Sequence, residues 1–307
     1  MQDQSLPSET IIIAGPTGAG KTDLALRLAE HLQGEIVGAD AFQIYKGLPL
    51  LTAQPSEAAQ GAIPHHLIGS IDPAEAYDVG RYLREARPIL NAIVARGRRP
   101  IVVGGTGLYV KALLYGLNDL PGNDPVLREE FAKMELQELI HRLKHLDPHA
   151  ETMLDLANRR RVERALEIVI LTGKPLSQSR TGATLSPVGV RTLLLVRDRE
   201  ELHARIASNV EAMFAQGVER EVGALPEERI GPTAAMTLGL REIRALGRGE
   251  ISRAEAMAAM KQATCHYAKR QMTWYKNQHP FPQLNRSIFS DEDQAFSEAL
   301  GLLGAVT

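Results

Sequence analysis

Short apolar runs alternate with amphipathic segments along the first part of the chain. The runs Ile11–Ala14, Glu35–Val37 and Ile101–Val103 are rich in β-branched residues, which is typical of buried strands. Two segments with helix-forming patterns lie between these runs and end at Gly34 and Gly97. Strands that alternate with helices in this way predict right-handed βαβ units, and therefore an α/β fold with a parallel sheet.

The pattern changes near Pro121. From residue 125 to 173 the chain is charged and helical in pattern, with a break at Asp147-Pro148. We therefore expect a helical insertion at residues 120–187.

An apolar strand pattern returns at Thr192–Val196 and a helical pattern follows it. The segment 177–189 is rich in Ser, Thr, Gly and Pro, which is typical of a linker. We therefore expect the core to comprise residues 1–119 and 188–307. After residue 281 we expect a modest terminal helix or a frayed tail.

A long helix is predicted over residues 252–276. Six of its side chains recur at spacings of three and four, which is most typical of packing against a core and less typical of a platform for stacked bases. They are Met257, Met260, Thr264, Tyr267, Gln271 and Trp274.

Composition narrows the class of protein. The chain has 307 residues, about two domains at ~150 residues each, and its 44% apolar and 23% charged residues are ordinary for a globular protein. The net charge of -2 lacks the strongly basic balance of many nucleic-acid binders, so any RNA contact requires a local patch. The single cysteine, Cys265, excludes an internal disulfide and favours a cytoplasmic protein. We expect no membrane segment, because no apolar run reaches ~18 residues. We expect no secretory signal, because residues 1–10 are polar and acidic and no basic region precedes an apolar one.

The first strand is followed by a complete phosphate-binding motif, G-x-x-x-x-G-K-[ST]. Its glycines allow backbone N–H groups to turn around phosphate oxygens, its lysine supplies a full charge, and its threonine hydroxyl can ligate Mg²⁺. The loop therefore predicts a P-loop NTPase-like core that binds a phosphorylated ligand. The motif comprises Gly15, Pro16, Thr17, Gly18, Ala19, Gly20, Lys21 and Thr22.

An acidic residue usually ends a later strand in such proteins and orients Mg²⁺ or water. Here the third strand ends in Gly104-Gly105-Thr106-Gly107 and has no acid, whereas Asp40 follows the second strand. Asp40 is either a turn residue or a group that accepts a proton from a nucleophile.

The ordered motifs resemble the tRNA dimethylallyltransferase family, also called tRNA isopentenyltransferases, from about Ile11 to Trp274. The segments that carry the resemblance are Gly15–Thr22, Asp40 with Gln43, Tyr45 and Gly47, Pro64–Ile68, Gly104–Tyr109, Asp124 with Arg128, Arg160–Glu167, Tyr267–Gln271 and Thr273–Trp274.

The resemblance implies transfer of a dimethylallyl group from dimethylallyl diphosphate to N6 of the adenosine 3′-adjacent to a tRNA anticodon. Lys21, Thr22 with Mg²⁺, and Arg205 would then stabilise the departing diphosphate. Asp40 would act as the base, and Thr106 would lie at the reacting centre. The target base must leave the anticodon-loop stack to reach such a site.

The resemblance also implies contacts with the tRNA anticodon stem-loop. The segment Asn158–Arg164 holds four arginines and one glutamate, a patch suited to RNA phosphates, although a solvated helix face explains these charges equally well. We expect the protein to act as a monomer. The residues expected to contact tRNA are Asp40, Ala41, Phe42, Gln43, Thr106, Arg128, Arg160, Arg161 and Arg164.

Five positions depart from the family pattern. Ala41 replaces a serine, Gln54 a lysine, Gly69 an aspartate and Leu240 an aromatic residue. Asn209 replaces an arginine that binds diphosphate in the family, and a neutral amide forms bonds about half as strong as charge-assisted ones. These changes are compatible with altered activity or substrate preference.

Three alternatives stay open at this stage. The acceptor could be a free adenine nucleotide, the protein could be a P-loop small-molecule kinase, or it could be a weakly active RNA-binding relative. His65 and His66 lack partners at metal-ligand spacing, so we interpret them as a turn or strand-edge pair, and Cys265 as a packing residue.

Overall fold

A computed structural model describes residues 6–117, 120–179, 188–278 and 280–304. The chain divides into two compact units, one formed by residues 1–114 and 186–307 and the other by residues 115–185. Part of the predicted linker, residues 180–187, lies outside the described residues. Each unit is described by itself.

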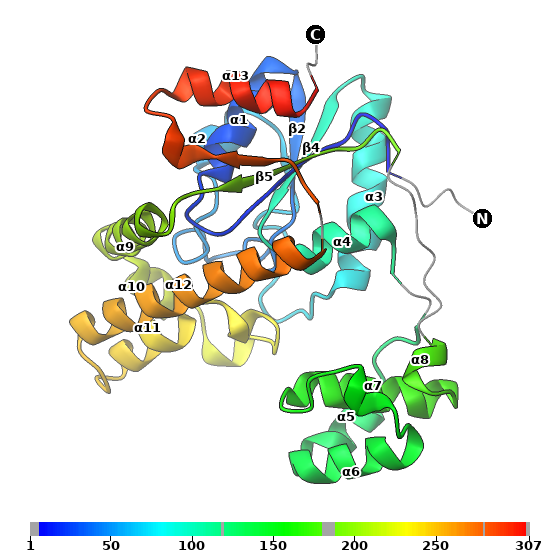
Figure 1. Cartoon of the computed structure of the whole chain (residues 1–307). Helices are drawn as coiled ribbons and strands as arrows, with labels where there is room; N and C mark the ends of the chain where they lie inside the picture. The colour runs from blue at the N-terminus through cyan, green and yellow to red at the C-terminus, as the bar shows by residue number, and fades with distance from the viewer. Residues whose placement is uncertain (1–5, 118–119, 180–187, 279, 305–307) are drawn as a thin grey trace. The chain divides into compact units, whose positions relative to one another are not determined.

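The first unit is an α/β core that contains all six strands (Figure 1). Its strands are β1 (Ile11–Ala14), β2 (Gly34–Gly38), β3 (His65–His66), β4 (Arg99–Gly104), β5 (Arg191–Val196) and β6 (Gln283–Asn285). Its helices are α1 (Lys21–His31), α2 (Glu57–Ala62), α3 (Val79–Ala95), α4 (Gly107–Tyr115), α9 (Arg199–Ala215), α10 (Val218–Gly223), α11 (Leu240–Gly247), α12 (Arg253–Gln278) and α13 (Glu292–Leu302).

The six strands form one parallel sheet in the order β3-β2-β4-β1-β5-β6. The α/β, P-loop NTPase-like fold is thereby confirmed. His65 and His66 form the edge strand β3, so the strand-edge interpretation of this pair is also confirmed. The terminal helix expected after residue 281 is confirmed as α13, whereas the strand β6, which pairs with Leu194–Val196 before α13 begins, was not predicted. A three-residue strand is too short to show a period of two.

One apolar cluster holds the sheet to two helices that are far apart in the sequence. Alternate side chains of β1, including Ile11 and Ile13, pack with Leu28 of α1 and with Ala299 and Leu303 at the end of the chain. Burial of such aliphatic side chains contributes about 1.5–3 kcal/mol each. This cluster fixes the start of α1, and therefore the loop that precedes it.

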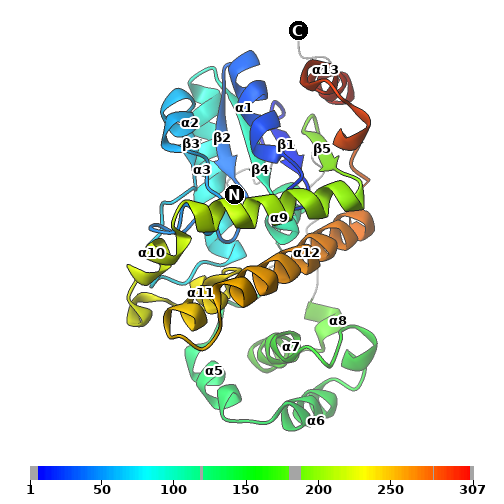
Figure 2. The ribbon, with the colours of Figure 1, turned by 90° about the vertical axis from the view of Figure 1, so that its left-hand side faces the viewer.

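Helices α9 and α12 lie side by side, as both ribbon views show (Figures 1 and 2). Ile206 of α9 and Ala268 of α12 are both buried in one apolar cluster, with Cys265 packed against it. The packing role predicted for Cys265 is thereby confirmed. This pairing brings α12 to the functional end of the sheet, where its polar residues contact the loop described below.

The second unit is helical and has its own core. It contains α5 (Pro125–Ala132), α6 (Leu136–Leu146), α7 (Arg159–Thr172) and α8 (Leu176–Ser179), and Asp147-Pro148 lies at the predicted break. Phe131, Leu139, Leu143 and Leu166 are fully buried in its centre. Within the described ranges of the chain, no helix combines the length and apolar character needed to cross a membrane.

Candidate active site

The phosphate-binding loop connects the end of β1 to the start of α1. Gly15 has a φ of +151°, and a Cβ atom there would lie 2.3 Å from the carbonyl oxygen of Leu195, so only glycine fits. Gly20 precedes α1 and provides no side-chain cap for it. The first N–H groups of α1 are therefore available to an anion, which the helix dipole also favours.

Lys21 lies in the first turn of α1 and is half-buried in the loop. Its Nζ donates a hydrogen bond to the Pro16 carbonyl oxygen at 2.8 Å. Burial lowers the pKa of Lys21 to about 8, and the negative charge of Asp40 offsets part of this effect. The ammonium is therefore held at the phosphate loop and is sensitive to pH in the neutral to basic range.

This pKa predicts a pH-dependent affinity for inorganic diphosphate. Raising the pH through about 8 removes the positive charge of Lys21, which favours the anion. The binding advantage of the wild type, defined as the diphosphate Kd of Lys21→Met divided by that of the wild type, should therefore shrink by up to about tenfold per pH unit. Calorimetric titration of both proteins between about pH 7 and 9.5 measures this advantage, because the ligand's own titration is common to both. An advantage that stays constant over this range would contradict the prediction.

Asp40 follows the carboxyl end of β2 and forms a local turn. Its Oδ1 accepts hydrogen bonds from the backbone N–H of Phe42 at 2.9 Å and of Gln43 at 3.4 Å. No described residue donates a hydrogen bond to Oδ2. The turn therefore fixes the carboxylate by one oxygen and leaves the other for a substrate, so the turn role and the proton-acceptor role are compatible.

Thr106 connects the ends of β4 and β2. Its Oγ1 accepts a hydrogen bond from the Ala41 N–H at 2.9 Å, and its own N–H donates to the Ala39 carbonyl at 3.2 Å. Ala41 thus takes part through its backbone N–H, a group that a serine at this position would also provide. These bonds place Thr106 beside the turn of Asp40, as the sequence analysis expects.

Tyr267 of α12 lies close to the same turn. Its hydroxyl lies close enough to the side chains of Thr106 and Gln271 for both to act on its pKa, and its ring centroid lies 5.9 Å from that of Phe42. Burial and the charge of Asp40 raise the pKa of Tyr267, so it stays protonated at neutral pH. The half-buried Tyr267 therefore belongs to the site as well as to the helix stripe.

Gln271 of α12 bridges the phosphate loop and β4. Its Oε1 accepts from the Thr17 N–H at 2.9 Å, and its Nε2 donates to the Gly105 carbonyl at 3.0 Å. A Cβ atom at Gly105 would lie 2.1 Å from this Nε2, so the close approach requires glycine. Gln271 is buried, as the packing interpretation predicts, but it also bridges two backbone segments, which that interpretation did not include; Met260 lies in an apolar core. The sequence signal for this role is an amide side chain within an apolar helix stripe, because a buried amide needs hydrogen-bond partners.

Two arginines hold the outer side of the loop. Arg205 of α9 donates from Nε to the Gly18 carbonyl at 3.0 Å, and Arg197 donates from Nε to the Ala19 carbonyl, also at 3.0 Å. Asn209 is exposed one turn beyond Arg205. Arg205 is among the site residues predicted from the sequence and Arg197 is not, although Arg197 directly follows β5 at the end of the sheet where the loop lies.

Two departures from the family pattern meet in space. Gln54 donates from Nε2 to the carbonyls of Gln43 and Tyr45, both at 2.9 Å. Its Oε1 lies 3.1 Å from the position of a Cβ atom on Gly69. The two positions that depart from the family pattern are therefore neighbours in the structure. The Gln43 side chain donates to the Ala53 carbonyl at 2.8 Å, so its amide is committed to this turn.

The second unit brings two of the expected tRNA contacts together around one carboxylate. Arg128 and Arg164 bind Glu167, with N–O distances of 2.9 and 2.6 Å, and Glu167 is fully buried. Arg160 and Arg161 are exposed on the first turn of the same helix, α7. Contact of these arginines with tRNA stays a prediction, but two of them also have a structural role.

Glu167 predicts a stability effect in this unit. Burial alone would raise the pKa of Glu167, but hydrogen bonds from Arg128, Arg164 and the Asp124 N–H outweigh it and lower the pKa to about 2. The stabilisation is therefore present above pH ~4.5 and is lost as the pH falls toward 2. We expect Glu167→Gln to lower the free energy of unfolding at neutral pH by about 3 kcal/mol, measured by urea denaturation.

The control for this prediction is Glu129→Gln in the same unit. Glu129 pairs with Lys133 at the surface, so its loss should change the free energy of unfolding by less than about 0.5 kcal/mol. Equal effects of the two variants would show that the buried carboxylate has no special role.

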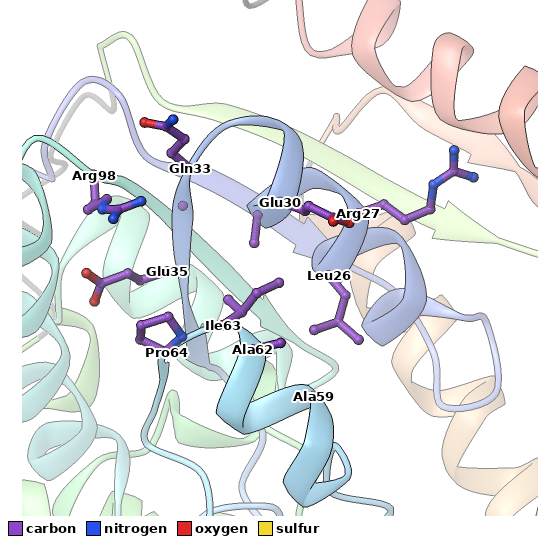
Figure 3. Close-up of a pocket in the computed structure, with 12 residues that line it drawn as sticks. Leu26, Arg27, Glu30, Gln33, Glu35, Ala59, Ala62, Ile63, Pro64 and Arg98 are labelled. Atoms are coloured by element: carbon purple, nitrogen blue, oxygen red, sulfur yellow. The ribbon is translucent and has the colours of Figure 1, made fainter.

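A hollow of about 510 Å³ lies between α1, α2 and the amino end of β2, and the predicted site residues are not among those that line it (Figure 3). Its walls include Leu26, Ile63 and Pro64, and Glu30 and Arg98 lie at its border. Among the described residues, no three His, Cys, Asp or Glu side chains form a group able to hold a metal.

Comparisons with known proteins agree with this geometry. The family model described as "IPP transferase" matches residues 43–278. The tRNA dimethylallyltransferase 1 of Citrifermentans bemidjiense is 43% identical over 90% of this chain and 91% of its own length. The tRNA dimethylallyltransferase of a Caulobacter species is 42% identical over 89% and 91%.

Solved structures give the same result. The full-length tRNA isopentenylpyrophosphate transferase of Bacillus halodurans superposes with a TM-score of 0.70, at 31% identity over 97% of both chains. A eukaryotic dimethylallyltransferase crystallised while acting on tRNA superposes with a TM-score of 0.81 over 95% of this chain and 77% of its own, at 27% identity. A family match over most of the chain, supported by fold and by site motifs, therefore establishes that this protein belongs to the IPP transferase family, the tRNA dimethylallyltransferases.

Proposed function

We propose that this protein transfers a dimethylallyl group from dimethylallyl diphosphate to N6 of the adenosine 3′-adjacent to a tRNA anticodon. The observation that carries the proposal is the pairing of a phosphate loop with an acceptor carboxylate in one site. Lys21 lies in the loop, and Asp40 is close enough for its charge to act on the Lys21 ammonium. A donor held by the loop would therefore place its reacting carbon beside the carboxylate.

The loop would stabilise the leaving group. As the allylic C–O bond breaks, its electron pair passes to the diphosphate, and negative charge grows there. Lys21 and the N–H groups at the start of α1 face this charge. The Thr22 hydroxyl, half-buried in the first turn of α1, suits Mg²⁺, which commonly takes one or two protein ligands and completes its shell with phosphate oxygens and water. When bound, the ion would neutralise part of the diphosphate charge.

Asp40 and its neighbours would prepare the acceptor. The adenine amine is a weak nucleophile because its lone pair is delocalised into the ring. As N6 forms its bond to the allylic carbon, the free Oδ2 of Asp40 would accept the proton that N6 loses. Thr106 is hydrogen-bonded to the N–H of Ala41, the residue after Asp40, and Tyr267 lies near enough for the Asp40 charge to act on it, so both would orient the base.

Incubation of the purified protein with labelled dimethylallyl diphosphate and Mg²⁺ tests the proposal. Label should pass to a tRNA that carries adenosine at the target position and not to the same tRNA carrying guanosine there. AMP in place of tRNA tests the free-nucleotide alternative, and ATP with no prenyl donor tests the kinase alternative. Faster labelling of AMP than of tRNA, or ATP consumption without the donor, would overturn the proposal.

A further inference from the structure

We propose that Arg197 is a positioning residue that holds the Ala19–Gly20 peptide of the phosphate loop so that the Gly20 N–H faces the diphosphate. This inference rests on the proposed function, because it assigns a role in binding the leaving group. Arg197 directly follows β5, and its side chain is only 7% exposed.

The argument starts from the geometry of the peptide bond. Arg197 donates from Nε to the Ala19 carbonyl oxygen at 3.0 Å. In a trans peptide, the C=O and the following N–H point in opposite directions, and the described residues contain no cis peptide. A guanidinium that holds the Ala19 carbonyl therefore fixes the Gly20 N–H so that it points away from Arg197, the direction in which we place the diphosphate.

The Ala19–Gly20 peptide requires a hydrogen bond from outside the loop to fix its orientation. Gly20 has a φ of +93°, and glycine permits neighbouring peptides to rotate more freely than other residues do. No described residue accepts a hydrogen bond from the Gly20 N–H. The N–H is therefore left for a ligand, and nothing on the inner side of the loop fixes it before the ligand binds.

Arg205 provides the contrast. It donates to the Gly18 carbonyl, but the N–H of that peptide, on Ala19, is already donated to the Pro16 carbonyl at 3.3 Å. Arg205 therefore supports the Gly18–Ala19 peptide, whose N–H already forms a hydrogen bond within the loop. Arg197 supports the peptide whose N–H is free, so the two arginines differ in what they contribute.

Arg197 is itself fixed at two points. Its NH1 binds Glu201 of α9, and Glu201 in turn accepts a hydrogen bond from the Ser287 hydroxyl. A planar guanidinium reaches the Ala19 carbonyl and the Glu201 carboxylate at once because its donors are spread over a rigid fork, which a lysine ammonium lacks. The position therefore requires arginine and not only a positive charge.

The test compares Arg197→Met and Arg197→Lys with Arg199→Met, which removes an exposed arginine from the start of α9. We expect Arg197→Met to raise the Kd of inorganic diphosphate and the KM of the donor about tenfold, with the tRNA Kd unchanged. Arg197→Lys should recover less than about a third of the lost affinity, and Arg199→Met should bind like the wild type. Thermal unfolding is measured for every variant.

Each outcome decides a different point. A wild type that fails to bind diphosphate would overturn the proposed function. Wild-type affinity in Arg197→Met, or full recovery in Arg197→Lys, would overturn only the positioning role. Should Arg197→Met fail to fold, Glu201→Ala replaces it, because this change removes the acceptor that holds the guanidinium but leaves Arg197 in place. A Glu201→Ala variant with unchanged diphosphate affinity would then contradict the inference.

Discussion

Asp40→Asn should lower the rate of prenyl transfer by about 10²–10⁴ while tRNA binding stays within about twofold. Asparagine has the same shape as aspartate, and its amide oxygen can still accept the hydrogen bonds that the Phe42 and Gln43 N–H groups donate to Oδ1. What the variant loses is the negative charge and the basic Oδ2, which has no donor among the described residues. The loss should therefore appear in the chemical step.

The measurement is single-turnover transfer with saturating donor and tRNA, since this isolates chemistry from binding and product release. Asp72→Asn is a matched control, because Asp72 forms the same type of turn, with its Oδ1 accepting from the Ala74 N–H at 3.0 Å, and belongs to no part of the site. The control should transfer at the wild-type rate. If Asp40→Asn keeps more than about a third of that rate, Asp40 is not the base.

The parts of the fold that the sequence predicts are those with strong local patterns. Ile11–Ala14 is a β-branched run between a polar segment and a glycine, and it is β1 in the structure. The edge strand Gln283–Asn285 has no such pattern, because its place in the sheet depends on pairing with β5, about ninety residues earlier in the sequence. Pairing over such a separation leaves no local trace in three residues.

The site also contains residues that local motifs predict and residues that only the tertiary structure reveals. The loop, Asp40 and Thr106 belong to contiguous motifs, and the structure places Asp40 and Thr106 beside the same backbone turn, at Ala41. Gln271 and Arg197 act on backbone atoms of Thr17 and Ala19, partners that only the packing of α12 and β5 against the loop reveals. Hydrogen bonds to a distant main chain impose no spacing on the sequence. Such residues are therefore found only once the tertiary contacts are known.

Lys21→Met should lower transfer by about 10²–10³ without lowering the thermal stability of the protein. The ammonium would stabilise the charge that grows on the diphosphate, and methionine keeps most of its length but none of its charge. Burial lowers the pKa of Lys21 to about 8, which means that the folded state disfavours the charged form relative to the unfolded chain. Removing the charge at neutral pH therefore relieves a cost in folding while it removes a contribution to catalysis.

Lys21→Met is expected to lower the transfer rate without lowering the stability of the protein, and this combination distinguishes a catalytic role of Lys21 from a structural one. A lysine that merely supported the loop through its bond to Pro16 would lose activity and stability together when replaced. We expect instead that the unfolding temperature of Lys21→Met equals or exceeds that of the wild type, whereas the exposed control Lys46→Met changes neither quantity. A melting temperature that falls in parallel with the transfer rate would assign Lys21 to the stability of the loop and would leave the departing diphosphate to the backbone N–H groups of α1.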